Sequence, residues 1–292
     1  MRDNESLQLS RVPSDHLVNT PTSSLFYRLY LSVCANHLTD AEKWLKQGVS
    51  PNETIVVNKK TTVPLFKAVR NNNVEMIKLL IAHKADLDVI DEREISPLMI
   101  AAYNGYTEAF FTLLNAGASY EDHPSLEDPE NELHPEIAGR TLIAAIRGGS
   151  FAIFQTLVDK EIDVNSYITL PVDEVLGCDC CKKIQNYANM FRKKHSFKTT
   201  ALIACASYNR IEMAKLLLSK GVNVNATSYE SGSALCQAAS FGYVQMAELL
   251  LQAGALQHQF LTKNHKRYRP LEIAAQNGHH EIFQVLIQYN ST

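Results

Sequence analysis

The strongest constraint on this chain is a pattern that returns along its length. Seven copies of the pattern begin at leucines, namely Leu29, Leu65, Leu98, Leu142, Leu202, Leu235 and Leu271. Seven residues after every one of them stands an asparagine or a glycine, the residue types that most readily adopt a left-handed backbone. Twelve residues further on comes a second set of turn positions, which are Gly48, Lys84, Gly117, Glu161, Gly221, Gly254 and Asn290. This constant spacing predicts a helix, a tight reversal and a second helix in each copy.

The stretch Thr199 to Asn225 is the clearest copy. It predicts a short helix over Ala201 to Ser207, a reversal at Asn209 and a second helix over Glu212 to Ser219, which Gly221 ends. One such helix pair is too small to bury its apolar side alone. The copies are therefore expected to stack into an all-α solenoid that grows by repetition and needs no second core.

Several segments of the pattern resemble ankyrin repeats. Val63-Pro64-Leu65-Phe66, Ser96-Pro97-Leu98-Met99 and Arg269-Pro270-Leu271-Glu272 are similar to the T-P-L-H opening of that family, although the histidine is absent from every copy. The resemblance covers about residues 25–292. It implies an ankyrin-repeat solenoid of about seven helix-turn-helix repeats, with hairpin fingers between them, that works in protein–protein interaction.

The pattern divides the chain into a short leader and one repeat domain. Residues 1–20 are polar and are expected to be mobile, and residues 21–292 are expected to form the solenoid. The repeats lie near 21–52, 62–91, 95–120, 139–165, 199–225, 231–257 and 268–292, with insertions at 121–139 and 166–198. The last helix reads like an internal one, so this end is expected either to be covered by further chain or another molecule, or to be an ordinary short cap.

The two insertions have opposite charge. The first contains only acidic charges, which are Glu121, Asp122, Glu127, Asp128, Glu130, Glu132 and Glu136, and is interpreted as a solvated loop or as a contact for a basic partner. The second contains a possible amphipathic helix that could pack on the solenoid or meet a partner. Its basic residues are grouped with those of the last finger as one basic patch: Lys182, Lys183, Arg192, Lys193, Lys194, Lys266, Arg267 and Arg269.

Composition limits where the protein works. Lys and Arg number 28 against 31 Asp and Glu, so no field of the whole chain attracts nucleic acid or membrane. The sequence shows no signal-peptide pattern and no apolar run of membrane-spanning length. A soluble, cytoplasmic protein is expected, and Cys205 and Cys236 fit it as reduced core residues. Any attraction to anionic membrane or nucleic acid must be local to the basic patch, and membrane is the more expected of the two. The alternatives to a protein-binding adaptor are therefore a targeting module that docks through the basic insertion, or the substrate-recruiting part of a larger enzyme.

The residues before each reversal are the candidates for partner binding. In ankyrin repeats these positions face the concave groove, and here they supply Arg70, Tyr103, Arg147, Tyr208 and Phe241. Interface hot spots favour Tyr, Trp and Arg, so these side chains are predicted to bind a protein with help from Glu92, Arg93 and Tyr229 on the fingers. The alternative is that each aromatic ring only covers its neighbour.

Chemistry beyond binding has weak support in the sequence. Cys178, Cys180, Cys181 and His195 are soft ligands, but their spacing suits free thiols better than a zinc site. No phosphate loop, metalloprotease or serine-nucleophile motif occurs, so no catalytic activity and no cofactor are expected. Asn165 resembles the asparagines that hydroxylases modify in ankyrin domains, or it serves only the turn. Large insertions of this kind also resemble ankyrin proteins that bacteria deliver into host cells, where this one would act in the host cytoplasm.

Overall fold

The protein is a curved column of helix pairs. The computed structural model describes residues 21–57, 60–91, 95–120, 139–160, 162–171, 196–229, 231–263 and 266–290. Within them the first helices of the pairs, here called the inner helices, are α1 (Pro21–Cys34), α3 (Pro64–Arg70), α5 (Pro97–Tyr103), α7 (Arg140–Gly148), α12 (Ala201–Ser207), α14 (Ala234–Phe241) and α16 (Pro270–Asn277).

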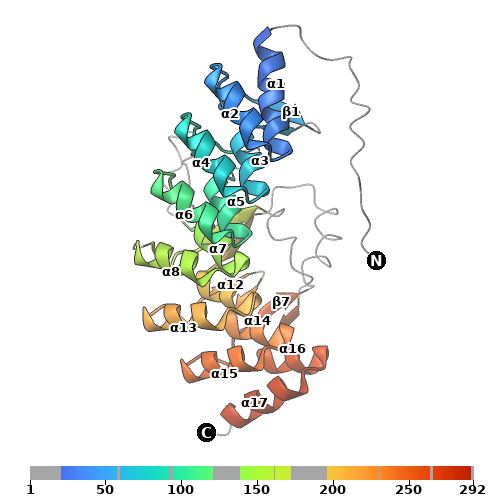
Figure 1. Cartoon of the computed structure of the whole chain (residues 1–292). Coiled ribbons are helices and arrows are strands. Elements are labelled where there is room, and N and C mark those ends of the chain that lie inside the picture. The colour runs from blue at the N-terminus through green and yellow to red at the C-terminus, as the bar shows by residue number, and fades with distance from the viewer. Residues whose placement is uncertain are drawn as a thin grey trace, which may run out of the picture.

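The second helices of the pairs, here called the outer helices, lie in a parallel layer. They are α2 (Leu38–Lys46), α4 (Val74–Ala82), α6 (Thr107–Asn115), α8 (Phe151–Asp159), α13 (Ile211–Ser219), α15 (Val244–Gln252) and α17 (His280–Asn290). Figure 1 shows the outer helices on the convex side of the column. The inner helices lie beside them towards the concave side, where the strands are also found. The predicted all-α repeat fold is confirmed.

The inner helices begin where the sequence supplies a helix-starting residue. Pro64, Pro97 and Pro270 occupy the first turn of their helices, where the missing N–H removes no hydrogen bond. At α5, α12 and α14 the side chains of Ser96, Thr200 and Ser233 accept a hydrogen bond from a backbone N–H of the first turn. These starts make the repeat leucine the second residue of α3, α5, α12, α14 and α16.

The predicted reversals have left-handed backbone. A residue one or two positions after each inner helix has a positive φ in all seven described pairs, including 59° at Asn36, 51° at Asn72 and 53° at Asn209. Lys84 keeps a φ of 64° at a turn after an outer helix, where four other copies have glycine. Asn290 differs from the expectation, because it is the last residue of α17 rather than a reversal.

Four fingers between the repeats are antiparallel hairpins. Their strands are β1 (Ile55–Val57) with β2 (Lys60–Thr62), β3 (Ile168–Pro171) with β4 (Ser196–Thr199), β5 (Thr227–Ser228) with β6 (Gly232–Ser233), and β7 (Leu261–Lys263) with β8 (Lys266–Tyr268). Ile168 pairs with Thr199, so the second insertion is a long extension of one finger. Residues 1–20, most of the first insertion (121–138) and residues 172–195 lie outside the described residues.

The core runs along the whole column between neighbouring pairs. The repeat leucines are at most 2% exposed in the first six copies, and Leu271 in the seventh is partly exposed. On the outer helices, Phe110 and Phe154 are completely buried at the same repeat position. The equivalent Phe283 in α17 packs against the core but is only partly buried, and Ile287 of the same helix is 39% exposed.

Candidate partner-binding surface

The five predicted groove residues lie at the same end of successive inner helices. Arg70, Tyr103 and Phe241 end α3, α5 and α14, Arg147 is the second-last residue of α7, and Tyr208 follows α12 directly. This arrangement follows from the repeat, which returns each inner helix to the same orientation. The residues therefore form a row at the carboxyl-terminal ends of the inner helices. The finger strands lead into the amino-terminal ends of inner helices and lie on the concave side of the column (Figure 1).

Tyr103 and Arg147 form one unit on neighbouring repeats. The guanidinium carbon of Arg147 lies 4.1 Å from the centre of the Tyr103 ring, and 37% of Tyr103 is exposed. Such a cation–π contact contributes roughly 0.5–1 kcal/mol at an exposed site. The contact also holds both side chains in one orientation, so a partner would meet an ordered aromatic and cationic surface.

Arg70 is held by groups of its own repeat. One of its guanidinium nitrogens lies 3.7 Å from the Asp91 carboxylate, and the Phe66 ring lies 5.8 Å from the guanidinium carbon. Asp91 also accepts a hydrogen bond from the backbone N–H of Ile95, which fixes the carboxylate at the base of the finger. The Arg70 side chain remains 46% exposed. Guanidinium has five N–H donors, so it can bind a further acceptor.

Tyr208 and Phe241 are more covered than Tyr103. Phe241 stacks on Tyr243, with ring centres 5.5 Å apart and planes inclined by 22°. Tyr208 is partly buried and packs against the core. At both positions the aromatic ring therefore covers neighbouring side chains, as the alternative interpretation expects, although each ring keeps some exposed surface.

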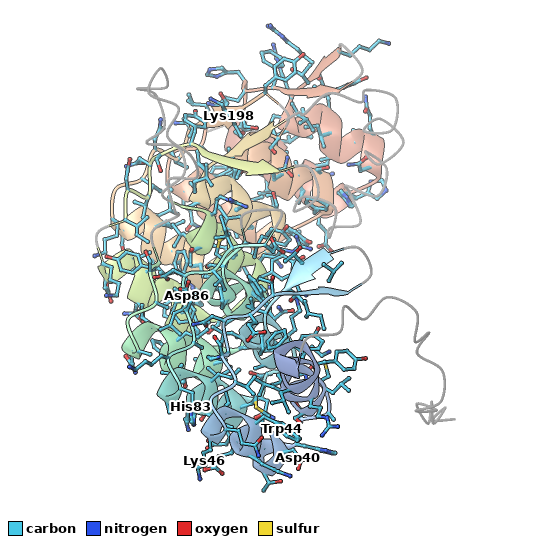
Figure 2. All side chains as sticks on the ribbon, turned by 90° about the horizontal axis from the view of Figure 1, so that it is seen from above. Asp40, Trp44, Lys46, His83, Asp86 and Lys198 are labelled. Carbon is cyan, nitrogen blue, oxygen red and sulfur yellow. The ribbon has the colours of Figure 1, made fainter. Side chains whose placement is uncertain are left out.

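The fingers contribute Tyr229 and part of the basic patch. Tyr229 follows β5 and is 74% exposed. Lys266, Arg267 and Arg269 are exposed, and the guanidinium carbons of the two arginines lie 5.9 and 5.7 Å from the Phe260 ring. Figure 2 shows Lys198 beside hairpin strands, whereas Asp40, Trp44 and Lys46 gather at α2. Glu92, Arg93, Lys182, Lys183, Arg192, Lys193 and Lys194 lie outside the described residues.

Polar residues just after the reversals join one repeat to the next. Arg210 donates hydrogen bonds to the carbonyls of Ile146 (2.9 Å) and Arg147 (2.8 Å) at the end of α7. At the equivalent position two repeats later, His279 lies 3.1 Å from the Ser240 carbonyl of α14. Sequence reasoning missed these residues. The signal was available, since both stand eight residues after a repeat leucine.

Asn165 is part of a series of contacts between finger bases. Its side-chain oxygen accepts a hydrogen bond from the backbone N–H of Asn223 at 2.9 Å. Asn225 repeats this role one unit later by accepting from the N–H of Leu256 at 2.8 Å. The Asn165 side chain thus links two repeats. Its modification by a hydroxylase stays a prediction.

The structure describes three cysteines, Cys34, Cys205 and Cys236, and all of them belong to the helix pairs. Burial raises the pKa of the Cys205 and Cys236 thiols, and the hydroxyl of Ser233 partly offsets the effect at Cys236. Both therefore stay as neutral core side chains. Cys178, Cys180, Cys181 and His195 lie outside the described residues, and among the rest no three His, Cys, Asp or Glu residues gather as a metal site would require.

The family follows from the extent of the match. The family description "Ankyrin repeats (3 copies)" matches residues 29–123, 175–261 and 228–292, which is well over half of the chain. The chain belongs to the ankyrin-repeat family. Ankyrin repeats generally mediate protein–protein interaction and are typically non-catalytic. No described helix of this ankyrin-repeat protein has the length and apolar character needed to cross a membrane.

Solved ankyrin-repeat domains share the fold at low sequence identity. The human ASB11 ankyrin repeat domain is 19% identical with a TM-score of 0.64, and the alignment covers 93% of this chain and 98% of that one. The ankyrin repeat domain of Bcl-3, a member of the IkappaB family, is 20% identical with a TM-score of 0.55, with 89% and 97% covered. These likenesses show the fold alone.

A curated relative aligns over one part of the chain. The putative ankyrin repeat protein FPV222 of Fowlpox virus (strain NVSL) is 32% identical over 71 residues. That stretch is 24% of this chain and 9% of the viral protein. The alignment therefore shows that some repeats of the two proteins are similar, and it does not extend to the rest of the viral protein.

Proposed function

We propose that this protein is a non-catalytic adaptor that binds a partner protein through the row formed by Arg70, Tyr103, Arg147, Tyr208 and Phe241. The observation that carries the proposal is the Tyr103–Arg147 contact, because it presents an ordered pair of hot-spot residue types, an exposed tyrosine and a partly exposed arginine, on two neighbouring inner helices. Work in the cytoplasm fits the buried, unoxidised Cys205 and Cys236. The same surface would serve an adaptor of the cell itself or an effector delivered into it.

Replacing Tyr103, Tyr208 and Phe241 together with alanine is expected to abolish capture of the partner from a cell lysate. The three rings supply most of the apolar area on the row, and hot-spot truncations typically cost about 2 kcal/mol or more each. The measurement is affinity capture followed by mass spectrometry, with the helical circular-dichroism signal as the test of folding. The matched control replaces Phe151 and Tyr289, exposed aromatics of outer helices, with alanine. Equal recovery of the same proteins by both variants would refute the site.

The finger β7–β8 supports a second candidate, which is docking on an anionic membrane. Lys266, Arg267 and Arg269 are exposed there, and no Asp or Glu occurs between Leu249 and Leu271. Replacing Arg267 and Arg269 with glutamine is expected to weaken binding to phosphatidylserine vesicles at low salt, measured by sedimentation, by about thirtyfold, since each surface cation contributes roughly 1 kcal/mol. No sedimentation of the unmodified protein at low salt would exclude this candidate.

A further inference from the structure

The last described repeat exposes two positions that every earlier repeat buries. These positions stand 4 and 12 residues after the repeat leucine, and both are completely buried in the six earlier repeats. The residues at the first position are Val33, Val69, Ala102, Ile146, Ala206 and Ala239, and those at the second are Ala41, Ile77, Phe110, Phe154, Ala214 and Ala247. In the seventh repeat Ala275 is exposed at the first position, and Phe283 is only partly buried at the second.

The loss of burial is confined to one side of the α16–α17 pair. Ala274, Ile282 and Leu286 of the same helices remain completely buried, because α16 packs on α14 and α17 packs on α15. Figure 1 shows α17 as the final helix of the column. Ala275 and Phe283 therefore lie on the side of the pair on which each earlier repeat receives its successor.

Four apolar residues make up this side, which is here called the end face. They are Leu271, Ala275, Phe283 and Ile287. By sequence α16 and α17 contain neither Lys nor Arg, and their acidic residues are Glu272 and Glu281. The Glu272 carboxylate accepts a hydrogen bond from the backbone N–H of Arg269 at 2.9 Å. Glu281 has the repeat position of Glu75 and Glu108, which stay exposed with repeats on both sides, so this position does not face along the column.

The opposite end of the column is covered by cations. Trp44 in α2 has the repeat position of Leu80 and Leu113, which are completely buried, but Trp44 itself is partly exposed. The guanidinium carbon of Arg28 lies 5.4 Å from the centre of the Trp44 ring, and the amine nitrogen of Lys43 lies 4.9 Å from it. These cations give the first repeat the polar outer face that terminal repeats normally have. The end face differs from it by being apolar.

We infer that the end face binds the end face of a second copy of this chain, which joins two columns into a dimer with twofold symmetry. The contact continues the stacking that joins successive repeats, since a helix pair covers the same positions in each earlier repeat. Ala275 and Phe283 lie three and five residues from the reversal at Gly278, and therefore at a similar height on α16 and α17. A twofold axis parallel to the helices places α16 against α17 of the other copy, so each Phe283 meets an Ala275 across the interface.

Charge favours this arrangement over a head-to-tail one. Stacking the end face on the first repeat of another copy would bury Arg28 and Lys43 against apolar side chains, where a cation without an acceptor is costly. It would also continue into an open filament, whereas a contact between two identical faces closes after two copies. Only two helices of each copy take part, so the contact lies at the small end of specific interfaces and is reversible.

A dimer of this kind would hold two partner-binding rows in one particle. Two linked rows bind a partner that has two copies of its own site more tightly than one row does, without any new contact. The inference goes beyond the proposed function and does not depend on it, because the end face and the row share no residue.

Sedimentation velocity of the unmodified chain from about 2 to about 200 µM tests the dimer, over the range in which a small reversible contact dissociates. The test variant is Ala275→Arg, which places a guanidinium on the end face at an exposed residue. The matched control is Ala82→Arg, at an exposed alanine that ends α4. Ile287→Lys, at a residue that is 39% exposed, repeats the test on α17. Circular dichroism compares the folding of all variants.

We expect the mass to rise with concentration from one copy to two and to stop there. Ala275→Arg and Ile287→Lys are each expected to weaken association at least about tenfold, because a buried cation loses its hydration without gaining an acceptor. Ala82→Arg is expected to stay within about twofold of the unmodified chain, as surface substitutions usually do. A single-copy mass at the highest concentration, growth beyond two copies, unchanged association of the folded end-face variants, or an equal loss with Ala82→Arg would each overturn the inference.

Discussion

Replacing Phe154 with alanine is expected to lower the free energy of unfolding by about 4 kcal/mol, because truncation of a buried phenylalanine costs about 3–5 kcal/mol. The ring lies in α8 with none of its surface exposed, and it belongs to the continuous core between repeats. Only the side chains of α8 and of the adjacent repeats could move to fill such a cavity, since each repeat contacts only its neighbours. Urea unfolding followed by circular dichroism measures the loss.

Phe151 provides the matched control for this change. It stands one turn earlier in the same helix, and 41% of it is exposed. Phe151→Ala is expected to cost less than about 1 kcal/mol, since surface substitutions usually have small effects. Equal losses for the two phenylalanines would contradict the burial assigned to α8.

Replacing Gly148 with alanine is expected to cost about 2–3 kcal/mol, the upper part of the range of about 1–3 kcal/mol that overpacking typically costs. A Cβ atom at this position would overlap the Ala102 carbonyl oxygen and would lie 2.8 Å from the Gly105 nitrogen and 3.0 Å from the Tyr103 oxygen. All three are backbone atoms of the preceding repeat and cannot rotate away. Alanine favours helices by about 1 kcal/mol over glycine, so the overlap must outweigh that gain.

Gly254→Ala separates overlap from backbone strain. Gly254 has a φ of +88°, and a Cβ there would meet no atom within 4 Å. Its substitution is expected to cost about 1–2 kcal/mol from left-handed backbone alone. The unfolding midpoints of both variants, measured in urea, give the comparison. If Gly148→Ala were as stable as the unmodified protein, α5 and α7 would have to be further apart than the structure places them.

The repeat pattern made most of the fold predictable. The asparagine or glycine after each leucine marked every reversal, and even Lys84 was found by spacing although its residue type argued against a left-handed turn. Helix bounds followed to within a residue or two, as at α12. Periodicity succeeds here because each contact is between residues at fixed positions of adjacent copies.

The binding surface was harder to predict because its details depend on pairs of side chains. The sequence placed Tyr103 and Arg147 in one row, but 44 residues separate them, and only the helix stack shows that the cation lies on the ring. The role of Arg210 was missed because a charged residue after a reversal normally points to solvent.

The links around the reversals all run in one direction along the column. Arg210 donates to α7, Asn277 and His279 approach the Ser240 carbonyl of α14, and Asn71 lies 3.4 Å from the Val33 carbonyl of α1. In each case a later repeat satisfies the carbonyls of an earlier one. At the finger bases the direction is reversed, because Asn52 and Asn225 donate to the carbonyls of Lys84 and Gly254 in the following repeat. Each repeat is therefore tied to both of its neighbours, and loosening of one repeat weakens the hydrogen bonds of the repeats on either side.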